Sequence, residues 1–180
     1  MKKIIYLIAL ISINSFAQSK YLTKTGTINF EASVPSVEEV KAENNSVTAI
    51  LNSDNGEFAA LVFVKGFRFK NALMEEHFNE NYAESDMYPK ATFKGKIKDF
   101  SMDMLNSELE FKLDGTLTFH GKTKQVNDVV ISLNKEDDLI SASGNFKVLV
   151  SDFDIKIPRI VRDKVSEEVQ ITYKFDLKKR

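Results

Sequence analysis

Apolar and polar residues alternate along much of the chain, and this period of two is the feature that most limits its possible folds. In residues 169–177, Val, Ile, Tyr, Phe and Leu alternate with Gln, Thr, Lys and Asp. Residues 109–119 show the same pattern, with Gly115 as a natural point for a bulge. Because successive strand side chains point to opposite faces, this pattern predicts strands with one buried face. We expect about eight antiparallel strands in an all-β barrel or sandwich.

Residues 58–69 differ, because both alternating sets are apolar. This predicts a single strand that is covered on both faces, with a helix packed on the outside of the sheet. The next segment supplies the helix: Asn71 is a plausible N-cap, and apolar side chains recur at helical spacing up to Tyr82. Pro89 would end this segment before the next strand. Turn-forming residues at 54–56 and 143–145 are predicted to separate other strands, and residues 158–168 to hold another helical turn.

The N-terminus is typical of a cleaved secretory signal. Two lysines precede an apolar run of about ten residues, which is too short to span a bilayer of roughly 30 Å as a helix. Small residues at Ser15 and Ala17 predict cleavage between Ala17 and Gln18, leaving one domain over residues 18–180. The chain has no cysteine, so no thiol follows the apolar run for lipid attachment. We therefore expect an exported protein, periplasmic or secreted, that is soluble after cleavage.

The composition of the chain excludes several classes of function. A formal net charge of −1 gives no electrostatic reason to expect a nucleic acid partner. The absence of cysteine excludes disulfides, thiol catalysis and thiolate metal sites. The fold must then depend on its core, for which 14 phenylalanines provide much apolar area. No second stretch approaches membrane-spanning length, so we expect no integral membrane segment.

Few residues suggest chemistry. His77 and His120 lack the spacing of a zinc helix, and we interpret each as a polar tip on an apolar face. Carboxylates are common near predicted strand ends, but no pair is marked as a catalytic one. Lys65, Arg68 and Lys70 are either a basic rim for an anionic head group or a solvated strand end. We predict no catalytic residue, no metal site and no cofactor.

Two longer motifs resemble a known family. Residues 76–82 with 88–95, and the run Gly-Thr-Leu-Thr-Phe-His-Gly-Lys-Thr-Lys at 115–124, are similar to stretches of the YceI-like family. Residues 146–155 resemble its next-to-last strand, and 169–177 its last. The resemblance implies a lipocalin-like, eight-stranded antiparallel barrel with a helix packed beside it. It also implies an exported protein that encloses a polyisoprenoid or related amphiphilic lipid without catalysis.

The leading hypothesis is therefore a non-enzymatic protein that carries a long apolar amphiphile, an isoprenoid or another lipid, inside its barrel. A barrel filled by its own side chains, acting through its surface as an envelope or stress-related module, stays open, as does a hydrolase based on strand-end carboxylates. A homodimer is also possible. Eight residues are expected to line the cavity: Phe63, Phe67, Phe93, Phe111, Leu113, Phe119, Phe146 and Val148. Four more are expected to pack on the barrel or gate it: Leu73, Met74, His77 and Phe78.

Overall fold

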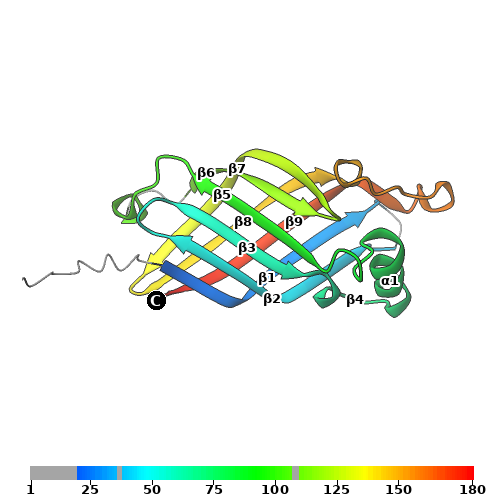
Figure 1. Cartoon of the computed structure of the whole chain (residues 1–180), viewed down its shortest axis with the longest axis horizontal. Helices are drawn as coiled ribbons and strands as arrows, with labels where there is room; N and C mark the ends of the chain where they lie inside the picture. The colour runs from blue at the N-terminus through cyan, green and yellow to red at the C-terminus, as the bar shows by residue number, and fades with distance from the viewer. Residues whose placement is uncertain (1–19, 36–37, 107–109) are drawn as a thin grey trace, which may run out of the picture.

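A computed structural model of the protein describes residues 20–35, 38–106 and 110–180. The predicted signal at residues 1–17 and Leu109 lie outside these ranges. Within them, eight long strands form a closed antiparallel barrel (Figure 1). They are β1 (Lys20–Ser33), β2 (Lys41–Asn52), β3 (Glu57–Phe63), β5 (Lys90–Ile97), β6 (Glu110–Phe119), β7 (Lys122–Glu136), β8 (Leu139–Leu149) and β9 (Val165–Lys179). The all-β prediction is confirmed.

The barrel has up-and-down connectivity. Each long strand pairs with the next one along the chain, and β9 closes the barrel by pairing with β1. The alternation seen in the sequence sets the register: in β9, Tyr173, Phe175 and Leu177 are buried, whereas Lys174 and Asp176 are exposed. The register of β6 and β7 shifts between Leu113 and Gly115, as expected beside this glycine, but the extra residue of the bulge lies on β7, where Asp128 has a φ of 55°.

The predicted strand over residues 58–69 is wrong as a single strand. β3 ends at Phe63, a 3₁₀ turn, η1 (Val64–Gly66), follows, and the chain resumes as the short β4 (Arg68–Phe69), which pairs with β2. The buried Asn44 explains the break, since its Nδ2 donates to the carbonyl of Phe63 over 3.0 Å. A Cβ at Gly66 would lie 2.5 Å from that nitrogen, so only glycine fits there.

The 3₁₀ turn also explains why both sets of side chains are apolar in this stretch. The inward set is Phe58, Ala60 and Val62 before the turn and Phe67 after it, and Val64, the first residue of the turn, is also buried. Phe63 belongs to the other set and points outward with 54% of its surface exposed. The apolar pattern therefore reflects a change of parity, and no helix covers the outer face of β3 at Phe63.

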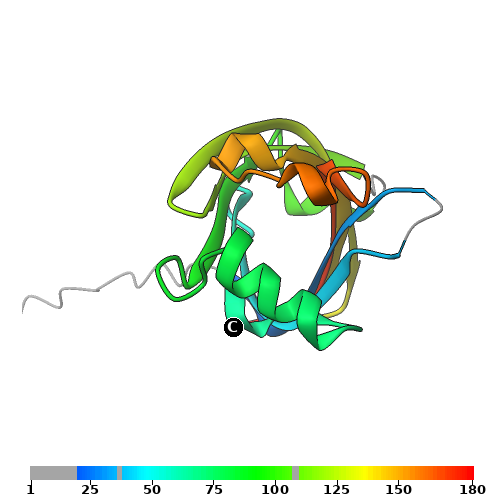
Figure 2. The ribbon, with the colours of Figure 1, turned by 90° about the vertical axis from the view of Figure 1, so that its right-hand side faces the viewer.

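The predicted helix forms at the expected residues, but it lies at one end of the barrel and does not cover the outer face of the sheet. α1 (Ala72–His77) begins at Asn71, whose side chain accepts a hydrogen bond from the Leu73 backbone over 2.9 Å, as expected of an N-cap. It continues as a π-helical turn, η2 (Phe78–Tyr82). Figure 2 shows this helix at one end of the barrel, opposite a second segment that carries two 3₁₀ turns, η4 (Val150–Phe153) and η5 (Arg159–Val161). The predicted turn near 158–168 is thus only η5, and the predicted strand over 146–155 ends at Leu149.

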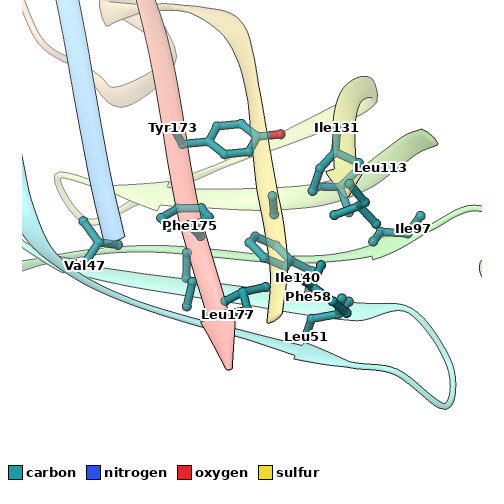
Figure 3. Packing of buried hydrophobic residues seen from close by; sticks show 14 of the residues in the cluster. Val47, Leu51, Phe58, Ile97, Leu113, Ile131, Ile140, Tyr173, Phe175 and Leu177 are labelled. Carbon is teal, nitrogen blue, oxygen red and sulfur yellow. The ribbon is translucent and has the colours of Figure 1, made fainter. Parts of the chain in front are cut away.

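The two ends of the barrel are built differently. At the end where the chain leaves β9, the interior is filled by buried apolar side chains, with η3 (Met102–Asn106) packed beneath them. Figure 3 shows part of this core, including Leu51, Ile97, Ile140 and Leu177. We call this the closed end. The opposite end, where α1, η4 and η5 lie, is the open end.

Glycines let aromatic rings lie against the inner wall. Gly95 and Gly115 face each other on β5 and β6, and a Cβ at Gly115 would lie 2.5 Å from Cζ of Phe93. Gly144, in a stretch predicted as a turn, instead lies within β8 beneath the Tyr173 ring. The turn prediction was wrong. The glycine is needed here because a side chain at this position would overlap the Tyr173 ring, and the chain does not change direction.

Candidate ligand cavity

An apolar cavity of about 350 Å³ occupies the half of the barrel near the open end. Most strands contribute to its walls, and α1, η2 and the chain around η4 and η5 form its mouth. Its charged or titratable lining residues, among those that the structure describes, are Glu38, His77, Lys164 and two tyrosines. The remaining lining is apolar, so the cavity can hold a hydrocarbon chain but offers few polar contacts.

Aromatic side chains form the floor of the cavity. Phe175 is 2% exposed and stacks on Tyr173, with ring centroids 5.5 Å apart and an interplanar angle of 18°. Phe58 packs against Phe175 at 5.8 Å, and Phe93 against Phe146 at 6.4 Å. Burial raises the pKa of the Tyr173 hydroxyl, which donates a long hydrogen bond of 3.5 Å to a backbone carbonyl on β7. The floor is therefore aromatic and uncharged at neutral pH.

Four phenylalanines join α1 to the barrel wall at the mouth. Phe30 of β1 lies 5.2 Å from Phe67, 5.6 Å from Phe69 and 5.1 Å from Phe78, measured between ring centroids. Phe78 also contacts Phe67 and Phe69. Three of these pairs, Phe30–Phe67, Phe30–Phe69 and Phe67–Phe78, are edge-to-face, and such pairs contribute roughly 0.5–1.5 kcal/mol each beyond their buried area. This phenylalanine cluster packs the start of η2 against the barrel wall, and Glu75 of α1 adds polar contacts to Arg68 and to the Phe69 backbone amide.

Polar ties hold the other side of the mouth. His120 is 12% exposed; its Nδ1 lies 2.8 Å from the carbonyl of Phe153, and its Nε2 lies 2.7 Å from a carboxylate oxygen of Glu84. His120 and Gly121 have φ of 49° and 70°, as expected for the two-residue type I′ turn between β6 and β7. His120 therefore joins this turn to η4 and to the loop after η2, which agrees with its interpretation as a locally bonded polar tip.

Two ion pairs continue this tie along β7. Lys122 pairs with Asp154 at 2.6 Å, and Lys124 pairs with Asp152 at 2.8 Å. Asp152 also accepts a hydrogen bond from the Leu149 backbone, over 3.3 Å, where the chain turns from β8 into η4. Phe153, which is almost fully buried, then packs edge-on against Phe119 at 5.7 Å. The two lysines thus fix the segment that carries Phe153 into the cavity wall.

Asp152 makes the stability of the fold depend on acid. Its hydrogen bond to Lys124 is the main cause that lowers the pKa of its carboxyl group, with the Leu149 amide adding to it. A carboxyl group with a lowered pKa stabilises the fold fully above the unfolded pKa of about 3.9. This stabilisation is lost as the pH falls through the folded pKa. We expect Asp152→Asn to be less stable than the wild type by roughly 1 kcal/mol at neutral pH, and we expect this difference to shrink toward zero in acid, where the wild type also loses the ion pair.

Urea denaturation between pH 2 and pH 7 (roughly the range over which carboxylates titrate) measures this effect. The matched control is Asp163→Asn, an exposed carboxylate with no ion pair among the described residues. The control should keep the acid dependence of the wild type. The same acid dependence in Asp152→Asn as in the wild type would show that the Lys124 pair contributes nothing.

Most residues predicted for the cavity lie in its wall. Nine of the twelve line it: Phe67, Met74, His77, Phe78, Phe93, Leu113, Phe119, Phe146 and Val148. Three do not. Phe63 and Leu73 point outward with 54% and 56% of their surfaces exposed. Phe111 is buried, but it packs against Phe100 near the closed end, with ring centroids 6.2 Å apart.

Several lining residues were missed. Phe153, Ile155 and Ile157 are all buried and line the cavity, although they follow the end of β8. Their alternation with polar residues was the available signal, but it was interpreted as a continuing strand. Phe30 and Phe58 also line the cavity, and only the direction of their strand faces was undetermined from sequence.

The basic cluster at the end of β3 does not line the cavity. Lys65 pairs with Asp86, Arg68 pairs with Glu75 at 3.0 Å, and Lys70 pairs with Glu39 at 3.0 Å. All three cations are mostly exposed. This favours the solvated strand end over a rim for an anionic head group. Among the described residues, no group of three or more His, Asp or Glu side chains is placed to hold a metal ion.

The sequence as a whole now agrees with the geometry. The family described as YceI-like domain matches residues 20–177. The chain belongs to the YceI-like family. No curated protein matches it. No helix among the described residues is long and apolar enough to cross a membrane.

Solved structures of YceI-like and similar proteins share the fold at low sequence identity. A polyisoprenoid binding domain from Saccharophagus degradans, implicated in plant cell wall breakdown, has a TM-score of 0.74 at 11% identity, covering 89% of this chain and 98% of that one. BcnA from Burkholderia cenocepacia has a TM-score of 0.70 at 17% identity, covering 84% and 94%. The YCEI protein of Campylobacter jejuni has a TM-score of 0.58 at 18% identity, covering 79% and 88%. The YceI-like barrel is therefore the fold of this chain.

Proposed function

We propose that this YceI-like protein is an exported, non-enzymatic binding protein that holds the apolar chain of an amphiphile, such as an isoprenoid or another lipid. The observation that carries the proposal is the apolar cavity of about 350 Å³ in a barrel that is closed at its other end. Each CH₂ group moved from water into such a cavity contributes about 0.8 kcal/mol. The polyisoprenoid binding domain from Saccharophagus degradans, which shares the fold, supports the same class of ligand.

The cavity volume favours this function over a barrel filled by its own side chains. Drug-sized ligands occupy pockets of roughly 300–1,000 Å³, and about 350 Å³ lies at the lower end of that range. The filled core is confined to the closed end. Since a water-sized group takes about 30 Å³, the cavity has room for about a dozen carbon groups before any side chain moves.

A carboxylate-based hydrolase has less support. Such an enzyme needs two acids facing one cleft, roughly 5–9.5 Å apart. Glu38 is the one carboxylate among the described residues that line the cavity. Asp114, within β6, and Asp128, within β7, share Lys98 on the outer surface, at 3.0 and 2.8 Å. A hydrogen bond from the Asp128 backbone amide, followed by the Lys98 contact, lowers the pKa of the Asp114 carboxyl group. Lys98 lowers the pKa of the Asp128 carboxyl group, and both shifts are the opposite of what a general acid requires.

Ligand content and uptake test the proposal. Protein purified from its host should release an apolar compound into organic solvent, and native mass spectrometry should show the matching mass difference. Stripped protein should then bind farnesol or dodecanoic acid from solution with one molecule per chain. Empty protein that takes up neither compound would contradict the proposal. N-terminal sequencing of the mature protein tests export separately, with Gln18 expected as the first residue.

A further inference from the structure

The loop formed by residues 156–164, which carries η5, places apolar side chains on both of its sides. Ile157 is buried and lines the cavity, and Val161 also lines it. Ile160, between them in sequence, is 88% exposed. In Figure 1 this loop reaches beyond the strand ends at the open end of the barrel. The large apolar side chain of Ile160 is therefore exposed to solvent on a loop that projects from the open end of the barrel.

The same loop is strongly basic. It contains Lys156, Arg159, Arg162 and Lys164 but only one acid, Asp163, in a chain whose formal net charge is −1. Arg162 lies 3.9 Å from Glu167, whereas Arg159 and Lys164 make no ion pair with any described residue. This contrasts with the cations at the end of β3, each of which has a carboxylate partner. The positive charge of the loop is therefore available to an external anionic group.

The opposite side of the mouth has the opposite charge. α1 and η2 present Glu76 and Glu80, both exposed, beside the exposed Leu73. A negatively charged surface would attract the 156–164 loop and repel this helix. The side of the mouth formed by the 156–164 loop is therefore expected to approach such a surface first. Leu73 is an exposed apolar side chain on the other side of the mouth, which is not expected to make contact.

We propose that the 156–164 loop docks the protein on the surface of a bilayer that contains anionic lipids, with Ile160 inserted among the head groups. Exposed apolar side chains flanked by Lys and Arg are what binding to an anionic bilayer interface requires. A stable protein interface buries about 800 Å² on each partner, far more than one isoleucine provides. Lys164 belongs both to this loop and to the cavity lining, so docking places the cavity mouth next to the lipid.

Sedimentation of the stripped protein with vesicles tests docking without any ligand in the cavity. We expect binding to equimolar phosphatidylethanolamine and phosphatidylglycerol at low salt, weak binding at high salt, and little binding to phosphatidylcholine alone. Ile160→Asp and Arg159→Glu should each weaken binding at least about tenfold. Leu73→Asp makes the same kind of change on the helix side and should bind like the wild type.

Docking of the loop does not require the proposed function, which only explains why docking would be useful. A second measurement separates the two. Ile160→Asp should take up farnesol from solution like the wild type but extract it more slowly from anionic vesicles. Wild-type vesicle binding by Ile160→Asp with an unchanged thermal midpoint, or equal binding to phosphatidylcholine, would overturn the docking surface. Retention on protein-containing membranes but not on lipid vesicles would overturn it in favour of a protein partner. Failure of farnesol uptake alone would overturn only the proposed function.

Discussion

Phe175→Ala is expected to lower the free energy of unfolding by about 3–5 kcal/mol, the cost of truncating a fully buried phenylalanine. The side chain lies where the filled core meets the cavity floor, stacked on Tyr173 and packed against Phe58. Equilibrium denaturation in urea measures the loss. Lys174→Ala, at the exposed neighbouring position of β9, should change stability by less than about 0.5 kcal/mol. A small effect at Phe175 would show that the floor collapses to fill the space.

A second substitution checks the cause. A Cβ at Gly26 would overlap Cδ1 of Phe175, so Gly26→Ala alone should destabilise the barrel by about 1–3 kcal/mol through overpacking. In the Phe175→Ala background that overlap disappears, and the same change should cost far less. The two effects are therefore expected to be strongly non-additive. Additive effects would contradict the contact between Gly26 and the ring.

Ala91→Trp is expected to weaken binding of a twelve-carbon acid by roughly 50–100-fold (about three displaced CH₂ groups at 0.8 kcal/mol each) while the protein stays folded. Ala91 lies on β5 in the cavity wall and is only partly buried, so the indole can project into empty space. Calorimetric titration with dodecanoic acid measures the affinity.

The matched control for this change is Ala59→Trp. Ala59 lies on β3, next to β5, but in the outward set of side chains and outside the cavity lining. The control should bind dodecanoic acid like the wild type. Wild-type affinity in a folded Ala91→Trp protein would place the ligand somewhere other than this cavity.

The barrel was predictable because alternation is a local property. Each of Tyr173, Phe175 and Leu177 identifies the buried face of β9 without reference to another strand. The interruption after Phe63 was not predictable in this way, since it depends on the buried side chain of Asn44, 19 residues earlier. The exposed position of Phe63 follows from that contact. The same reasoning applies to Gly144, whose role depends on the ring of Tyr173 on the neighbouring strand.

The cavity was predictable in its lining but not in its extent. Phe93 and Phe146, for example, lie in the wall on strands whose alternation is visible in the sequence. Whether that wall encloses space depends on how α1 and the chain after β8 cross the mouth, which is determined by aromatic contacts between distant segments. Phe30 and Phe78, for example, are far apart in sequence but have ring centroids 5.1 Å apart. Such packing has no periodic signature.

Closure of the barrel by β1 and β9 brings the two ends of the described chain together. The backbone amide of Arg180 donates to the carbonyl of Lys20 over 2.8 Å, at the closed end and remote from the cavity mouth. A tether at the C-terminus would therefore hold the protein with its mouth turned away from the support. Immobilised in this way on a sensor chip, the barrel would present the 156–164 loop and the cavity to whatever flows past.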